Sequence, residues 1–222
     1  IVDSLVGSEM CIRDSLSAKN KLLDEVKIAL ENWLVAGGDQ QYYYDENWRV
    51  LIGFPAAHGS DYALNDQHFH HGYAILAAAT IAQYDSAWAS QENWGGMINL
   101  LIKNASNWDK KDKDFPYLRN FDIYAGHGWA DGRAAWRLGN NQESSSESMN
   151  YAVGTFLWGQ ITGQDEIRDL GASCTLLNLR PLNSIGLMLI TKYFQRILTI
   201  KQLVWYQELV ACMGLGLAQI SK

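Results

Sequence analysis

Residues 72–84, GYAILAAATIAQY, constrain the fold more than any other stretch, because small side chains predominate in an almost uninterrupted apolar run. A helix built mainly from Ala and Gly can pack closely against its neighbours, since the distance between helix axes depends on the side chains at the contact. The run is too short to cross a bilayer. We therefore expect residues 72–84 to form a closely packed helix.

Three other segments show helical periodicity. Residues 22–35 place their apolar side chains on one stripe, and the AGG sequence that follows is a stop signal. Residues 92–105 repeat apolar positions at spacings of three and one, and a third stripe runs from about 145 to 161. Each pattern predicts an amphipathic helix.

Long polar segments join these predicted helices. Residues 39–71 and 106–129 are rich in Gly, Asn and Asp and are typical of irregular functional loops. Strand-like alternation is almost absent, and no repeat of 20–50 residues is visible. The pattern predicts an all-α fold, a helical toroid with its chemistry at one rim.

Composition limits the classes of partner. The 222 residues suit one domain with a sizeable core, and the net charge of −6 comes without a basic cluster, which argues against nucleic acid. No apolar run is long enough to span a membrane. Nine Trp and eleven Tyr fit either sugar-stacking surfaces or a large aromatic core. Cys11, Cys174 and Cys212 give no disulfide framework.

The sequence ALNDQHFHHGY at 63–73 gathers one acid and three histidines. Asp66, His68 and His70 could bind zinc, which accepts both His and carboxylate ligands. Alternatively, Asp66 could act as an acid with the histidines as hydrogen-bond donors around it. A polar loop whose histidines are satisfied by neighbours is the third interpretation.

The sequence FDIYAGHGWADG at 121–132 spaces Asp122, His127 and Trp129 with glycines. Glycine lets a backbone approach a ligand closely. The alternative is an ordinary glycine-rich turn.

The sequence GNNQESSSESMN at 139–150 places Glu143 and Glu147 four positions apart. Serine before an apolar stripe favours a capped helix start, and an acid in the first turn suits the helix dipole. Alternatively, coupled carboxylates can separate their pKa values and leave one as a base. Two carboxyl groups acting across a bond are typical of glycoside hydrolysis.

These three blocks, in this order, resemble the endo-β-1,3-glucanases of glycoside hydrolase family 81. The matching stretches are NDQHFHHGY, FDIYAGHGWADG and GNNQESSSESMNYAVGTFLWG, and the resemblance covers roughly residues 20–171. It implies a β-sandwich followed by an (α/α)₆ barrel, of which this chain would hold only part. It also implies inverting hydrolysis of β-1,3-glucan by a monomer located outside the cell or in its wall, without cofactor or metal.

The resemblance assigns roles by motif position. It implies Asp66 as general acid, Glu147 as general base and Glu143 as an auxiliary carboxylate. The residues implied to contact the sugar are His68, His70, Tyr73, Asp122, His127, Trp129, Asn141 and Gln142. Gln67 and His71 stand where the family usually has His and Tyr, and Gly128 stands where Ser is common. None of these departures removes a proposed catalytic group.

Both ends of the chain differ from the middle. Residues 1–15 lack the regions of a signal peptide and resemble a translated transposase-type sequencing adapter. After Ala172 acids and turn signals become scarce, and an offset reading frame would restore family-like sequence. We expect residues 1–15 to be a library scar, 16–171 a partial catalytic domain and 172–222 a frameshifted tail.

An incomplete toroid leaves helix faces uncovered, so hydrolysis is predicted for the parent enzyme rather than for this chain. Two alternatives remain open: a non-catalytic β-glucan-binding fragment, and a metal-dependent hydrolase that uses Asp66, His68 and His70.

Overall fold

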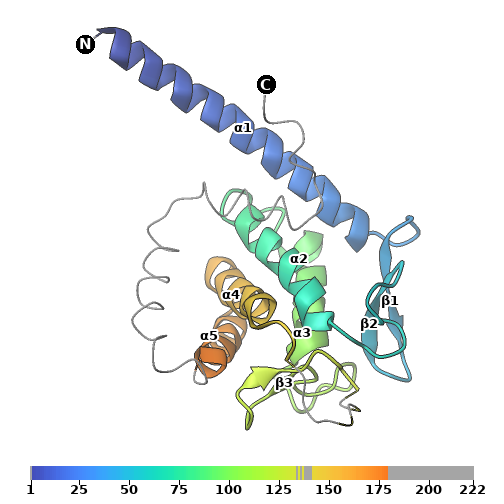
Figure 1. Ribbon diagram of the computed structural model, residues 1–222. Coiled ribbons are helices and arrows are strands. Elements are labelled where there is room, and N and C mark those ends of the chain that lie inside the picture. The colour runs from blue at the N-terminus through green and yellow to red at the C-terminus, as the bar shows by residue number, and fades with distance from the viewer. Residues whose placement is uncertain (1, 134, 136, 138–141, 180–222) are drawn as a thin grey trace.

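The computed structural model describes residues 2–133, 135, 137 and 142–179. Within them the chain forms five α-helices, a five-residue π-helical turn and two small antiparallel sheets (Figure 1). The prediction of an all-α fold is therefore confirmed as a helix-rich structure, whereas the (α/α)₆ barrel stays a prediction.

Helix α1 spans Val2–Leu34, and its N-terminal part extends away from the other helices (Figure 1). Toward its C-terminal end, buried side chains recur every three or four residues, as predicted for 22–35; they are Leu23, Val26, Leu30 and Leu34. This stripe packs into the same core as α2 and α3.

The segment 39–71, predicted to be irregular, contains a β-hairpin. Strands β1 (Gln41–Asp45) and β2 (Val50–Phe54) pair antiparallel, with Tyr43 opposite Ile52. The prediction was wrong here because Val50, Leu51 and Ile52 are all buried, so β2 shows no polar–apolar alternation. Leu51 is fixed further by Asn104, whose side chain pairs with both its N–H and its C=O.

Helix α2 spans Gln67–Ala82 and lies between α3 (Gly96–Ser106) and α4 (Ser145–Thr162) (Figure 1). It begins five residues earlier than predicted, so most of the 63–73 block lies on a helix. The turn Gln91–Gly95, which leads into α3, is π-helical.

Helices α2 and α4 approach each other through glycines. A Cβ atom on Gly72 would lie 2.9 Å from the backbone nitrogen of Tyr151, and one on Gly154 would lie 3.1 Å from that of Leu76. The first distance is shorter than Cβ contacts in proteins allow and the second is unusually short, so a side chain at either position would force the neighbouring backbone to shift. The predicted close packing of 72–84 is confirmed.

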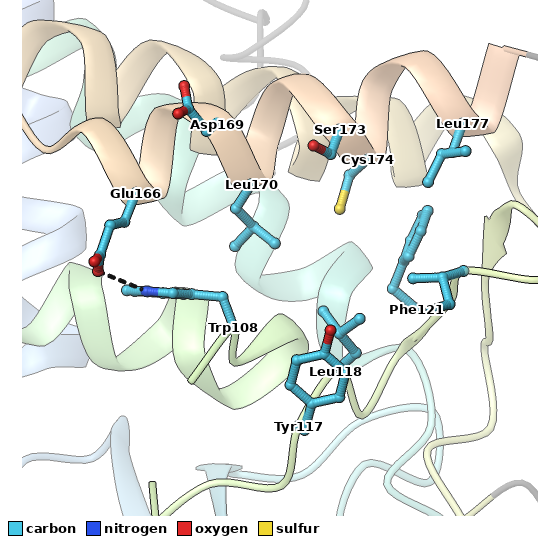
Figure 2. Close-up of a pocket in the computed structure, with 11 residues that line it drawn as sticks. Trp108, Tyr117, Leu118, Phe121, Glu166, Asp169, Leu170, Ser173, Cys174 and Leu177 are labelled. Atoms are coloured by element: carbon cyan, nitrogen blue, oxygen red, sulfur yellow. Dashed lines mark hydrogen bonds between the residues drawn. The ribbon is translucent and has the colours of Figure 1, made fainter. Parts of the chain in front are cut away.

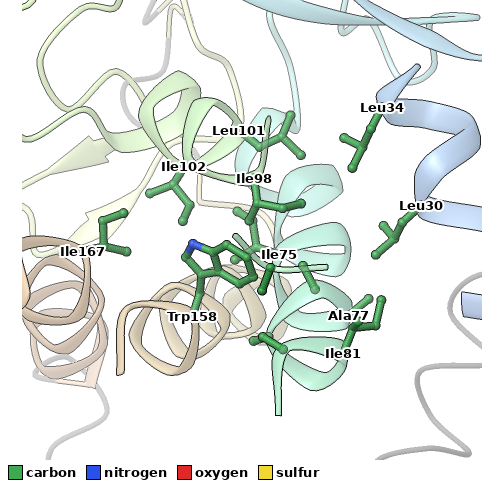
Figure 3. Packing of buried hydrophobic residues seen from close by; sticks show 14 of the residues in the cluster. Leu30, Leu34, Ile75, Ala77, Ile81, Ile98, Leu101, Ile102, Trp158 and Ile167 are labelled. Carbon is green, nitrogen blue, oxygen red and sulfur yellow. The ribbon is translucent and has the colours of Figure 1, made fainter. Parts of the chain in front are cut away.

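The core of the helical layer is centred on Trp158 of α4, which is fully buried. Figure 3 shows its ring among Ile75 of α2, Ile98 and Ile102 of α3 and Ile167. The indole N–H donates to Asn99 Oδ1 at 2.8 Å, which satisfies its polar atom inside the core. Several helices thus converge on one aromatic side chain.

Helix α5 (Asp165–Leu179) was not predicted and continues past residue 172. Cys174 on this helix is buried against Phe121 and Ala152. The division into 1–15, 16–171 and 172–222 is not tested by this geometry and stays a prediction. Among the described residues no helix is long and apolar enough to cross a membrane.

Candidate active site

Asp66 lies at the start of α2 in an unusual backbone conformation. Its φ of 58° is left-handed, and its side chain makes no capping hydrogen bond to the helix. Its backbone N–H donates to Ala130 O at 2.8 Å, and its C=O accepts from His70 N–H. The side chain is only 9% exposed, and Oδ1 has no hydrogen-bond partner. The backbone therefore holds this carboxyl group in place, and one of its two oxygens has no hydrogen-bond partner.

The start of α4 carries both glutamates of the 139–150 block. Ser144 caps the helix by accepting from Glu147 N–H at 3.4 Å, which confirms the predicted capped start. Glu147 lies in the first helical turn and accepts from the Tyr73 hydroxyl at 2.8 Å. Glu143 precedes the helix, is exposed and has a φ of 58°.

The starts of α2 and α4 are electrostatically coupled. Burial, together with the negative charges of Glu143 and Glu147, raises the pKa of Asp66 to about 6, while His58 acts in the opposite direction. A carboxyl group in such surroundings keeps its proton in mildly acidic solution. The structure thus brings together the three carboxylates that the sequence singled out.

The histidines of the block divide into one near the carboxylates and two in the core. His70 is half-buried; its ring centroid lies 5.6 Å from that of His58. Burial lowers the pKa of His70, as does His58, whereas Glu147 raises it. Burial also lowers the pKa values of His68 and His71 to about 3, so both rings are neutral.

His68 is one of the two histidines enclosed in the core. It is 2% exposed, and neither ring nitrogen has a hydrogen-bond partner. A Cβ on Gly128 would lie 2.7 Å from its Nε2, so only glycine fits opposite the ring. Among the described residues no group of three or more His, Cys, Asp or Glu side chains is arranged to hold a metal ion.

The 121–132 block forms a short hairpin, with β3 (Phe121–Asp122) paired to β4 (His127–Gly128). Asp122 Oδ1 accepts from the N–H groups of Tyr124 and Ala125 at 2.8 and 3.0 Å. One oxygen of this carboxylate therefore builds the turn, as the glycine-rich-turn interpretation expects.

The rest of the block joins the hairpin to α2. His127 Nδ1 lies 2.8 Å from Gly128 O. Trp129, half-buried, pairs with Asn120 through its backbone. Asp131 forms an isolated bridge with Asn65, directly before Asp66. These contacts place the second block beside the first.

Asn141 and Gln142 are the two amide residues among the predicted sugar contacts. Gln142 is half-buried and donates to Asn178 Oδ1 of α5 at 3.2 Å. Asn141 lies outside the described residues.

The sequence analysis did not single out His58, although a histidine next to glycine in a polar loop could have suggested it.

A separate cavity of about 340 Å³ lies between α5 and the loop that precedes β3 (Figure 2). Apolar side chains predominate in its lining, and Trp108 Nε1 donates to Glu166 at 2.9 Å. None of the three carboxylates lines this cavity.

The profile of the Glycosyl hydrolase family 81 C-terminal domain matches residues 4–196. The chain belongs to glycosyl hydrolase family 81. The predicted resemblance is thereby confirmed, and the three carboxylates lie within the matched family 81 region.

Relatives of known name agree with this family. A glucan endo-1,3-beta-D-glucosidase of Acetivibrio thermocellus is 52% identical over 160 residues, which are 71% of this chain and 21% of that protein. One from Thermobifida fusca is 51% identical over 166 residues, 72% of this chain and 22% of the relative. The chain thus spans about a fifth of the length of these relatives.

A solved structure shares the fold. It is a mutant form of a glycoside hydrolase family 81 protein from Clostridium thermocellum, with a TM-score of 0.71 and 48% identity. The match covers 75% of this chain and 24% of the other.

Proposed function

We propose that this chain is part of the catalytic domain of an inverting endo-β-1,3-glucanase. The observation that carries the proposal is the buried Asp66 carboxyl, whose Oδ1 has no hydrogen-bond partner and which interacts with the charges of Glu143 and Glu147. The curated relatives at 51–52% identity are glucan endo-1,3-beta-D-glucosidases, which supports β-1,3-glucan as the substrate.

Asp66 is assigned the role of general acid. Its pKa, raised to about 6 chiefly by burial, keeps the carboxyl protonated in mildly acidic solution. The proton passes to the glycosidic oxygen as the bond from that oxygen to the anomeric carbon breaks. The leaving sugar thus departs as a neutral alcohol.

Glu147 is assigned the role of general base. It removes a proton from a water molecule that attacks the anomeric carbon from the opposite face, so the β-linkage gives an α-product. Its place in the first turn of α4 and its hydrogen bond from Tyr73 hold the carboxylate in a fixed orientation. Glu143 acts as the auxiliary carboxylate that tunes the acid, because its charge raises the pKa of Asp66.

The residues predicted to contact sugar differ in how they lie relative to the carboxylates. His70 interacts with the charge of Glu147, Tyr73 donates a hydrogen bond to it, and the 121–132 block accepts from the Asp66 N–H through Ala130 O. His68 is enclosed, so its contribution would be to support the hairpin rather than to touch sugar.

We place the parent protein outside the cell or in its wall. A relative from Schizosaccharomyces pombe, 32% identical, is named a primary septum glucan endo-1,3-beta-D-glucosidase. A monomeric state stays a prediction.

The test is hydrolysis of laminarin by the chain and by the full-length protein that contains it. We expect the full-length protein to release reducing ends, and proton NMR should show the α-anomer first. A first-formed β-anomer would contradict inversion. Retention on insoluble glucan without turnover would favour the binding fragment, and activity lost with a chelator would favour the metal-dependent alternative.

Two matched variants test the roles of the glutamates. We expect Glu147→Gln to reduce turnover by about 1,000-fold, since a general base is lost, and Glu143→Gln to reduce it less. The opposite ranking would move the base to Glu143. Full activity of both variants would contradict the site.

A further inference from the structure

Tyr73 lies on α2, about two helical turns after the start of the helix, and Asp66 directly precedes that start. The Tyr73 hydroxyl donates to Glu147 Oε1 of α4 at 2.8 Å. The segment that begins with the proposed acid therefore also carries a hydrogen-bond donor to the proposed base.

The helices that carry this hydrogen bond are in close contact. Gly72, adjacent to Tyr73, faces the backbone of Tyr151, and Gly154 faces that of Leu76. Since the backbones themselves are in contact on this face, the separation of α2 and α4 is fixed by atoms that cannot change rotamer. The distance from Tyr73 to Glu147 is thus set by packed helices rather than by loops.

The groups facing Glu147 make a neutral donor suitable. Its charge acts on Asp66 and on His70; His58 acts on the same two groups, and Glu143 acts on Asp66. A Lys or Arg side chain here would be drawn to every carboxylate of the cluster. A phenol instead donates to one oxygen without adding charge.

We propose that Tyr73 is a positioning residue for the hydrolytic site, which holds the Glu147 carboxylate in the orientation needed to activate water and does not itself bind sugar. This inference rests on the proposed function, because it takes Glu147 as the base. It differs from the role in sugar contact that the sequence predicts for Tyr73.

The first test is steady-state kinetics of Tyr73→Phe in the full-length protein, with laminarin as substrate. Loss of a hydrogen bond to a charged group should lower kcat about 10-fold while KM changes by less than about twofold. A raised KM with unchanged kcat would show sugar contact and overturn the proposal.

The matched control is Tyr151→Phe. Tyr151 lies on α4, and its hydroxyl donates to Ile102 O at 3.0 Å within the core. Removing that hydroxyl should lower the melting temperature and leave kcat and KM unchanged. An equal fall in kcat in both variants would mean that any lost core hydrogen bond produces it, and would overturn the proposal.

A second readout does not depend on turnover. In crystal structures of the parent and Tyr73→Phe, we expect the Glu147 carboxylate to leave its original position in the variant. An unmoved carboxylate would overturn the proposal whether or not the protein hydrolyses glucan, whereas an inactive parent would overturn the proposed function alone. If Tyr73→Phe fails to fold, Tyr73→Met, which also lacks the donor, takes its place in both tests.

Discussion

Asp66, directly before α2, and Asp122, in the β3–β4 hairpin, each belong to one of the three sequence blocks singled out above, yet their surroundings differ. Asp66 is buried with one oxygen unpaired, and its pKa is raised to about 6. Asp122 is half-buried, and one of its oxygens accepts two backbone N–H groups. A carboxylate with local partners stabilises a turn, whereas one deprived of partners is available for proton transfer.

The largest expected effect is on turnover, which should distinguish Asp66 from Asp122. In the full-length protein, Asp66→Asn should reduce laminarin hydrolysis by about 1,000-fold, since the amide cannot donate a proton as an acid does. Asp122→Asn keeps a turn acceptor and should cost less than about 10-fold. The measurement is reducing-sugar release; similar losses for the two variants would remove the distinction.

The next largest expected effect is on the free energy of unfolding, through the close contact between α2 and α4. Gly72→Ala should lower the free energy of unfolding by about 3 kcal/mol, because the new methyl would meet the α4 backbone. Gly53→Ala is the control, since its Cβ would meet the Trp33 ring, which can shift, and should cost below about 1 kcal/mol. Urea denaturation measures both; a tolerated Gly72→Ala would show that the helices are not in close contact.

A third effect is the pH dependence of stability. The folded-state pKa of Asp66 is raised from 3.8 to about 6, so the folded chain binds this proton more tightly than the unfolded chain does. Its contribution is present below pH 3.8 and is lost as pH rises toward 6, by about 2 kcal/mol after allowance for solvent screening. Asp66→Asn should remove this loss in urea denaturation at pH 4 and pH 7; an unchanged pH slope would contradict it.

The smallest expected effect is on stability, through the turn of the β3–β4 hairpin. Asp122→Ala removes the acceptor of two backbone N–H groups and should cost about 1 kcal/mol, as loss of a helix cap does. Asp122→Asn, which keeps an acceptor oxygen, should cost only a fraction of this. Thermal denaturation can compare the two; equal losses would indicate that the negative charge, not the turn geometry, matters.

The sequence predicted the elements whose apolar side chains face one side. The stripe that contains Val26 and Leu30, and the stripe of α4, follow directly from helical periodicity. The β1–β2 hairpin was missed because its second strand is buried on both faces. The start of α2 was also missed, because Asp66 precedes it in a left-handed conformation and does not cap it.

The site was predicted as a set of residues, not as a geometry. Residue types and motif order indicated Asp66, Glu143 and Glu147, and the structure couples their charges. Their surroundings could not be predicted, since the enclosure of His68 and the reach of Tyr73 to Glu147 depend on how closely α2 and α4 pack.

The most direct test of the account is an NMR titration of the Asp66 side-chain carbon, assigned by comparison with Asp66→Asn. We expect this carboxyl to titrate near pH 6, because burial and the two glutamates favour its protonated form. A midpoint near the ordinary value of 3.8 would contradict its role as the general acid.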